Sequence, residues 1–339
     1  MKVCFSLLFN RVRRLSKQVA LLLIFPFAII QGAPPALHTE ADSFSPDDHY
    51  VATSFFHWLT SNGGQTVGPW LPLEGRENWT GEPDWWKTQI KHVMAANIDV
   101  IYVHLIHQLE AQRVNLFIAL DELRAEGYDT PKIAPFFDAQ VIYNDQPIQS
   151  LAEESVKDDL VGHYIRFFEQ YFDASKGDFA DDYLARQDDK PILNTWHVKF
   201  RFSNVDGLTR TDLTNRLSGA FGSGHPYFNN GVVMVTTALN PPNFSFADEH
   251  VAQFEINEYF YSVTFNSITS VQLKPGYWDQ NIRNPGSFLA RDGGSHYRDA
   301  WDMVDRNSVQ RIYIESWNEY AEGTGIYAAD PEGSPYIAP

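Results

Sequence analysis

Cysteine is almost absent from this chain, which has 339 residues and a single thiol, at Cys4. That position falls in an N-terminal stretch with the features of an export leader, so the protein left after cleavage has no thiol. This absence excludes a disulfide framework, a cysteine nucleophile and a cysteine-ligated zinc site.

Positive charge is also scarce. The chain carries 26 Lys and Arg against 43 Asp and Glu, which gives a formal net charge of −17. Nucleic acids and anionic membranes both attract clustered basic side chains. We therefore expect neither as a partner. The composition, 44% hydrophobic and 20% charged, is that of a folded globular protein.

Long hydrophobic runs are few. The run Val19 to Ile30 follows a stretch with five basic residues and no acidic one, and it contains Pro26. It is shorter than the roughly 20 residues of a spanning helix, so we interpret residues 1–33 as a secretory signal peptide, with a retained anchor as the alternative. Residues 34–47 are then an N-terminal extension and residues 48–339 the catalytic domain. Cleavage leaves a net charge of −22 and predicts a secreted or periplasmic protein without membrane insertion.

Several catalytic motifs are missing as well. The chain has no Gly-x-Ser-x-Gly elbow, Walker loop or Gly-x-Gly-x-x-Gly fingerprint, and no His-Glu-x-x-His helix. His104 and His107 are three residues apart, a spacing that would make them diverge along a strand. We expect no metal and no cofactor. The oligomeric state stays open.

From about residue 48 the chain alternates strand-like and helix-like segments. Apolar residues have helical spacing in Asp84 to Asn97, Arg113 to Gly127 and Leu151 to Phe172. The strand candidates are Val51 to Trp58, Ile98 to Leu105, Lys132 to Asp138, Pro191 to Val198, Val232 to Leu239, Glu255 to Tyr261, Val271 to Trp278 and Arg311 to Trp317.

Strands separated by helices pair in parallel, and this number of them predicts an α/β fold, a single (β/α)8 TIM-type barrel. A doubly wound sheet is the alternative, but the Gly-rich turn that normally follows its first strand is missing. Little sequence follows the last strand, so we expect an incomplete or atypical eighth helix.

The segment after the last strand candidate carries two carboxylates three residues apart, Glu319 and Glu322. Loops at the C-terminal ends of barrel strands form the active face, so both groups are predicted catalytic residues. Trp317, Asn318 and Tyr320 beside them would bind a hydroxylated ligand. The structural alternative is a capping box, because Ser316 precedes Glu319 by three residues.

The segment Trp317 to Thr324, WNEYAEGT, resembles the W/F-N-E-W-x-E-G-T signature of the endo-α-mannosidase-type glycoside hydrolases, family 99. Pro275 to Arg283, PGYWDQNIR, resembles the PGWDNTPR-like loop after their seventh strand. Ile90 to Val103 is similar to a helix-to-strand passage of the same family 99 enzymes. The resemblance spans about residues 50 to 330.

This resemblance implies a role for each carboxylate. The first Glu of the motif acts as a base on the sugar 2-hydroxyl and gives an epoxide-like intermediate, which assigns that role to Glu319. The second is the general acid/base for the leaving oxygen, which assigns that role to Glu322. Such chemistry needs one carboxyl with a raised pKa beside one that is ionised.

The chain departs from the family pattern at Ala321, between the two Glu residues, and at Tyr327 to Asp330. These loop positions shape sugar subsites, so the departures concern mannan specificity more than glycosidase chemistry. A related WNDYGES string occurs in α-1,3-glucanases, which are the alternative enzyme class.

Polar and aromatic residues at other strand ends are candidate substrate-binding groups. Aromatic rings stack on sugar faces, and Asp and Arg side chains hydrogen-bond hydroxyls. The selected residues are Asp138, Trp196, Trp278, Asp279 and Arg283.

Three hypotheses follow. The first is an exported glycoside hydrolase that cleaves an internal linkage of an α-mannoside-type or other α-glycan, with an oligo- or polysaccharide as its partner and a role in polysaccharide degradation. The second is a non-catalytic carbohydrate-binding barrel. The third is a structural barrel in which the Glu pair only caps a helix.

Overall fold

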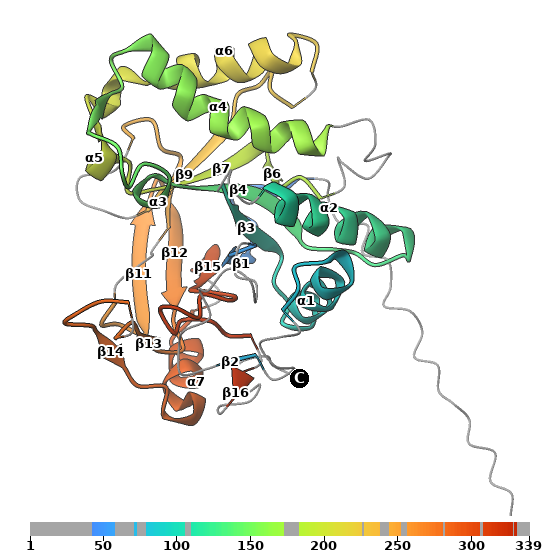
Figure 1. The fold of residues 1–339 in the computed structure, drawn as a ribbon, viewed down its shortest axis with the longest axis vertical. Helices are drawn as coiled ribbons and strands as arrows, with labels where there is room; N and C mark the ends of the chain where they lie inside the picture. Colours follow the sequence, from blue (N-terminus) through green and yellow to red (C-terminus); the bar gives the residue numbers. More distant parts are fainter. Residues whose placement is uncertain are drawn as a thin grey trace, which may run out of the picture. The chain divides into compact units, whose positions relative to one another are not determined.

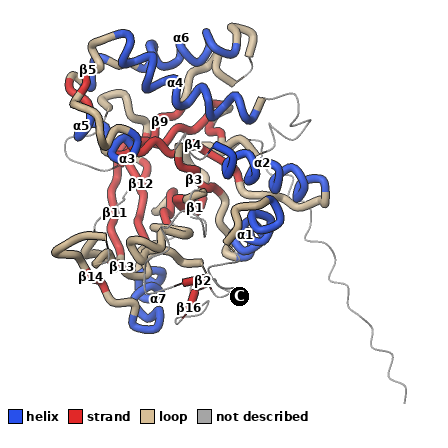
Figure 2. Tube along the Cα trace, in the orientation of Figure 1, coloured by secondary structure: helices blue, strands red, loops and turns tan. Residues whose placement is uncertain are grey.

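Residues 43–57, 71–72, 79–105, 110–172, 183–225, 227–237, 244–251, 256–280, 282–305, 308–327 and 329–330 are described in the computed structural model. The expected leader and most of the N-terminal extension therefore lie outside the described residues. The described residues form a mostly parallel sheet that is nearly closed into a barrel, with helices between strands, and this architecture matches a (β/α)8 TIM-type barrel (Figures 1 and 2).

The barrel strands run parallel and follow the predicted order. They are β1 (Tyr50–Phe55), β3 (Val100–His104), β4 (Lys132–Asp138), β7 (Lys190–Trp196), β9 (Val233–Thr237), β10 (Glu249–Val251), β12 (Ile268–Leu273) and β15 (Arg311–Ile314). Their helices lie on the outside because each crossover between parallel strands must return over the face of the sheet.

The longer helices are α1 (Pro83–Ala95), α2 (Glu110–Ala125), α4 (Glu154–Tyr171), α6 (Arg210–Phe221) and α7 (Ser295–Asp302). Pro83 starts α1 at a position where its missing N–H costs nothing. Thr209 and Asp212 form a capping box at the start of α6. The expected helices thus begin and end within a few residues of the observed ones.

Shorter elements decorate the loops. They are β2 (Leu71–Pro72), α3 (Ala139–Ile142), β5 (Gln149–Ser150), β6 (Arg186–Gln187), α5 (Val198–Arg201), β8 (Phe202–Ser203), η5 (Val205–Gly207), β11 (Phe260–Phe265), β13 (Tyr277–Trp278), β14 (Phe288–Leu289), η6 (Asp292–Gly294) and β16 (Ala329–Asp330). Helices α3 and α5 follow directly on β4 and β7, at the C-terminal ends of the strands.

The predicted sixth strand, Glu255 to Tyr261, is wrong. The sixth barrel strand is β10, three residues long, and Phe260 instead begins β11, which pairs antiparallel with β12. Among the described residues β10 and β12 share no strand ladder, and the buried pair Glu249 and Arg311 joins β10 to β15 instead. Because β10 is so short, it leaves no alternating pattern for sequence analysis to detect.

The expected atypical eighth helix concerns residues after β15. The described residues 315–327 form turns and contain no helix. Within the described part of the chain, no helix has the length and apolar character needed to cross a bilayer.

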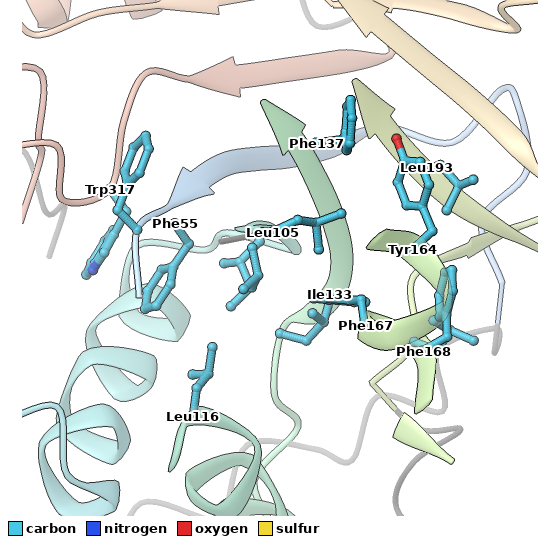
Figure 3. Close-up of a cluster of buried hydrophobic side chains, with 14 of the residues drawn as sticks. Phe55, Leu105, Leu116, Ile133, Phe137, Tyr164, Phe167, Phe168, Leu193 and Trp317 are labelled. Carbon is cyan, nitrogen blue, oxygen red and sulfur yellow. The ribbon is translucent and has the colours of Figure 1, made fainter. Parts of the chain in front are cut away.

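Two hydrophobic clusters form the core. Small and aromatic side chains from alternate strand positions, such as Ala52, Tyr102 and Phe136, fill the barrel interior. The larger cluster lies between the strands and the outer helices, and Figure 3 shows Phe137, Tyr164 and Phe167 within it. Burial on both faces explains why the barrel strands are nearly continuous apolar runs.

Candidate functional site

The loop after β15 carries both predicted catalytic carboxylates. The Glu319 N–H donates to Ser316 Oγ at 2.9 Å, and the Ser316 N–H donates to the Thr324 carbonyl at 2.9 Å. The first bond resembles half of a capping box, but the Glu319 side chain accepts from the Ala321 N–H at 3.0 Å instead of returning to Ser316. Since the described residues here form turns, Glu319 does not cap a helix.

Glu319 is buried, with 7% of its surface exposed. Burial raises the pKa of its carboxyl well above the ordinary value, and the negative charge of Glu322 raises it further. The N–H groups of Ala321 and Glu322 and the Arg283 charge oppose this rise without cancelling it. The loop therefore contains a carboxyl that holds its proton more tightly than an exposed Glu.

Glu322 is more open, with 21% of its side chain exposed. Its Oε1 accepts from Arg283 Nη2 at 2.6 Å, and its backbone carbonyl accepts from the Trp278 N–H at 2.8 Å. No other side chain of the described residues hydrogen-bonds this carboxylate. The two glutamates thus occupy different environments, one buried and one paired with a cation.

The loop after β13 supplies Arg283 and its second partner, Asp279. Arg283 Nη1 donates to Asp279 Oδ2 at 2.7 Å and to the Tyr277 hydroxyl at 2.8 Å, and Tyr277 donates to Asp279 Oδ2 at 3.0 Å. Although burial works against it, these bonds and one from the Ser287 N–H lower the pKa of Asp279. Asp279 is 1% exposed, so it contacts its neighbours rather than solvent.

Asp138 and Trp196 lie at the ends of the adjacent strands β4 and β7, where they are register partners. Asp138 Oδ2 lies 3.3 Å from His104 Nε2, and its Oδ1 accepts from the Val141 N–H at 3.1 Å. The half-buried Trp196 ring stacks on His197 with 3.6 Å between centroids. Burial lowers the pKa of His197 to about 4, with Asp138 opposing and Arg201 adding to that effect.

The three predicted binding residues next to the Glu pair face inward. Trp317 is fully buried, donates from Nε1 to Gln89 Oε1 at 3.1 Å and lies beside Phe55 in the core cluster (Figure 3). Asn318 accepts from the Phe56 N–H at 2.8 Å and donates to the Phe56 carbonyl at 2.9 Å. Tyr320 is 2% exposed and packs edge-on against Trp79. Their contacts join the loop to β1 and α1, whereas Trp278 is only partly buried.

Other charged residues at the C-terminal end were missed by the sequence analysis. Lys274 and Glu315, both buried, directly follow the paired strands β12 and β15. His57 follows β1, and burial, then Arg113 and His104, lower its pKa. Arg291 is buried and donates from Nη2 to the carbonyls of Gly323 and Gly325 at 2.9 and 2.7 Å. The sequence analysis placed His57, Lys274 and Glu315 inside its strand candidates, whereas the observed strands end before them.

Within the described ranges, no three His, Cys, Asp or Glu side chains come together in an arrangement that could hold a metal ion.

The fold resembles that of known glycosidases. The chain is similar to the GH99 endo-α-mannosidase from Bacteroides thetaiotaomicron, with a TM-score of 0.57 and 13% identity over 87% of this chain and 95% of that chain. A structure of a GH99 endo-α-mannosidase from the same organism in complex with bis-tris propane gives a TM-score of 0.53 and 16% identity, covering 83% and 88%.

No family model and no curated protein matches the sequence. The two endo-α-mannosidase structures nevertheless confirm, at the level of the fold, the family 99 resemblance predicted from the sequence.

Proposed function

We propose that the chain is a glycoside hydrolase that cleaves an internal linkage of an α-glycan, with Glu319 and Glu322 as its catalytic pair. The observation that carries the proposal is the contrast between these carboxyls on a fold shared with endo-α-mannosidases. Glu319 is buried with a raised pKa, while Glu322 is partly exposed and paired with Arg283. Glycosidases need two carboxyls in different protonation states beside the scissile bond.

The roles follow the family resemblance. Glu319 takes the proton of the sugar 2-hydroxyl, and that oxygen forms a bond to the anomeric carbon as the glycosidic bond breaks. Glu322 gives a proton to the leaving oxygen. Water then opens the three-membered ring, and both carboxyls return to their starting states. A raised pKa makes Glu319 the stronger base once it is ionised. These roles therefore require that Glu319 releases its proton and that Glu322 takes one up before the glycosidic bond breaks.

The proposed sugar-binding groups come from the ends of β4, β7 and β13. The partly buried rings of Trp196 and Trp278 would stack on sugar faces, and Asp138 would accept a hydrogen bond from a hydroxyl. Export by the leader at residues 1–33 would bring the protein to a secreted or periplasmic location, where polysaccharides occur.

The decisive experiment measures reducing-sugar release from a panel of α-mannans, α-1,3-glucans and other α-glycans. Wild type should release sugar from one class, and Glu319→Gln and Glu322→Gln should each lower kcat at least about 100-fold because each removes one proton-transfer group. The exposed Glu258→Gln is the matched control and should retain activity. Glycan binding without release by wild type would instead support the non-catalytic carbohydrate-binding hypothesis.

A further inference from the structure

Arg283 is expected from the sequence to hold a sugar, but its observed contacts are to protein. Nη2 donates to Glu322 Oε1 at 2.6 Å, while Nη1 donates to Asp279 Oδ2 at 2.7 Å and to the Tyr277 hydroxyl at 2.8 Å. We propose that Tyr277, Asp279 and Arg283 form a bracket that positions the Glu322 carboxylate, with Arg283 as a positioning residue. This inference rests on the proposed glycosidase function and assigns roles to residues that the proposed reaction leaves unused.

The base of the bracket is a tight turn. The Asp279 carbonyl accepts from the N–H groups of Ile282 and Arg283, each at 2.9 Å, and its side-chain Oδ1 accepts from the Ser287 N–H at 2.5 Å. A Cβ added at Gly286 would lie 2.9 Å from Asp279 Oδ1, so this loop closes too tightly for a side chain at that position. Asp279 is therefore a fixed anchor for the guanidinium group.

Asp279 is needed to hold the Arg283 guanidinium group in one orientation. Half of the Arg283 side chain is exposed (49%), and an exposed ion pair by itself is weak and poorly oriented. Its planar fork lets one nitrogen contact the Asp279 and Tyr277 oxygens while the other contacts Glu322. The Trp278 N–H bond to the Glu322 carbonyl joins the same two loops a second time. The carboxylate of Glu322 is thus fixed through both its main chain and its side chain.

Other ionisable side chains lie at the ends of β12 and β15 and in the two loops that follow. They include Lys274, Tyr277, Asp279, Arg291, Glu315 and Glu319. Among the described residues, Arg283 is the cation that contacts the Glu322 carboxylate, while Arg291 donates to backbone carbonyls. Removal of Arg283 should therefore affect Glu322 more directly than removal of any neighbouring charge.

The test compares Arg283→Met, Arg283→Lys, Tyr277→Phe and the Arg283→Met/Tyr277→Phe double variant on the α-glycan that wild type cleaves. Arg283→Met should lower kcat about 100-fold, because misplacing a catalytic group by about 1 Å costs that much, with little change in KM. Arg283→Lys should recover part of kcat. Its charge restores attraction to Glu322 but lacks the fork. Tyr277→Phe should lower kcat less and have no further effect when Arg283 is Met. The exposed Arg298→Met is the matched control.

Two kinetic results would overturn the bracket. One is a rise in KM with kcat unchanged in Arg283→Met, which would mean that Arg283 binds sugar. The other is a Tyr277→Phe effect of equal size with and without Arg283, which would mean that the two residues act separately.

A measurement without any glycan separates this inference from the proposed function. In 15N-arginine-labelled protein, Arg283 should give Nη signals with restricted rotation, identified by their loss in Arg283→Met. The Nη2 signal should lose its restriction in Glu322→Ala, which removes its acceptor, while the Nη1 signal, held by Asp279 and Tyr277, should keep it. Persistence of a restricted Nη2 signal in Glu322→Ala would overturn the bracket, whereas a wild type that cleaves no glycan but passes this test would overturn only the glycosidase proposal.

Discussion

The two ends of the barrel both contain an arginine and a glutamate, but they use the pair differently. At the N-terminal end of the strands, Arg311 donates from Nε and Nη2 to the two carboxylate oxygens of Glu249 at 3.0 and 2.8 Å. Arg311 also donates to Gln187 and lies 4.5 Å from the centre of the Tyr50 ring. Both charged residues are nearly inaccessible, at 3% and 1% exposure.

At the C-terminal end, Arg283 and Glu322 meet through one bond and both keep contact with solvent. The difference is one of access, because the first pair is sealed from solvent and the second can be reached from it. In the buried pair, both carboxylate oxygens of Glu249 accept hydrogen bonds from Arg311. This ion pair joins β10 to β15 and so helps to close the barrel. The open pair leaves a carboxylate oxygen available to a ligand, which agrees with the usual location of active sites in this fold.

The largest effect should come from breaking the closed end. Arg311→Met leaves the Glu249 carboxylate buried without its cation, which should lower the free energy of unfolding by about 3–5 kcal/mol. Urea denaturation measures this loss. The Arg311→Met/Glu249→Gln double variant should recover much of it, since no unpaired charge remains. Equal stability of the single and double variants would show that the ion pair does not close this end.

A smaller loss should follow from Asn318→Ala. Asn318 hydrogen-bonds both the N–H and the carbonyl of Phe56, so its removal leaves two buried backbone groups without a partner. The expected loss is about 2 kcal/mol in the free energy of unfolding, measured by urea denaturation. Asn115→Ala, which loses a single bond to the Gly81 carbonyl, is the control and should lose less. If KM rose while stability stayed constant, the predicted sugar-binding role of Asn318 would be favoured.

The smallest expected effect is a dependence of the free energy of unfolding on pH, caused by the raised pKa of Glu319. The native protein keeps a proton on Glu319 that the unfolded chain releases near its ordinary pKa of 4.5. The native state therefore binds more protons than the unfolded chain. The resulting stabilisation of the native state is fully present below pH 4.5 and is lost as the pH rises through the raised pKa of Glu319. The slope is at most about 1.4 kcal/mol per pH unit.

Glu319→Gln should lack this slope. Urea denaturation of wild type and variant at several pH values between about 5 and about 8 checks it. Parallel curves for the two proteins would mean that Glu319 ionises normally in the folded state.

Sequence patterns predicted the barrel well where elements are long. The predicted strand Lys132 to Asp138 matches β4, because a buried run between turns leaves a clear signal. Strand β10 was missed because it has three residues, and its first residue, the buried Glu249, pairs with Arg311, which lies 62 positions away. No local pattern carries information about such a distant partner.

The candidate site shows the same limit. Position after the last strand was enough to select Glu319 and Glu322, which share one loop in the structure. The direction of Trp317 could not be inferred, because the chain leaves the strand after Ile314 and strand alternation no longer applies. Similarly, Arg283 was predicted as a substrate-binding loop residue, but its protein partners depend on a turn whose closure only the structure reveals.

The pairing of β1 with β15 has a consequence for folding. Tyr50 and Arg311 are register partners more than 260 positions apart, and the carbonyls of Pro46 and Asp48 accept from the same Arg311. Contacts of such sequence separation form slowly because a long loop must close first. During synthesis the first strand must keep one edge unpaired until nearly the whole chain exists, and the loop that carries both glutamates is made at the same late stage. A ribosome-bound chain that ends before β15 can therefore have neither a closed barrel nor a complete site, so activity should emerge only with the final segment.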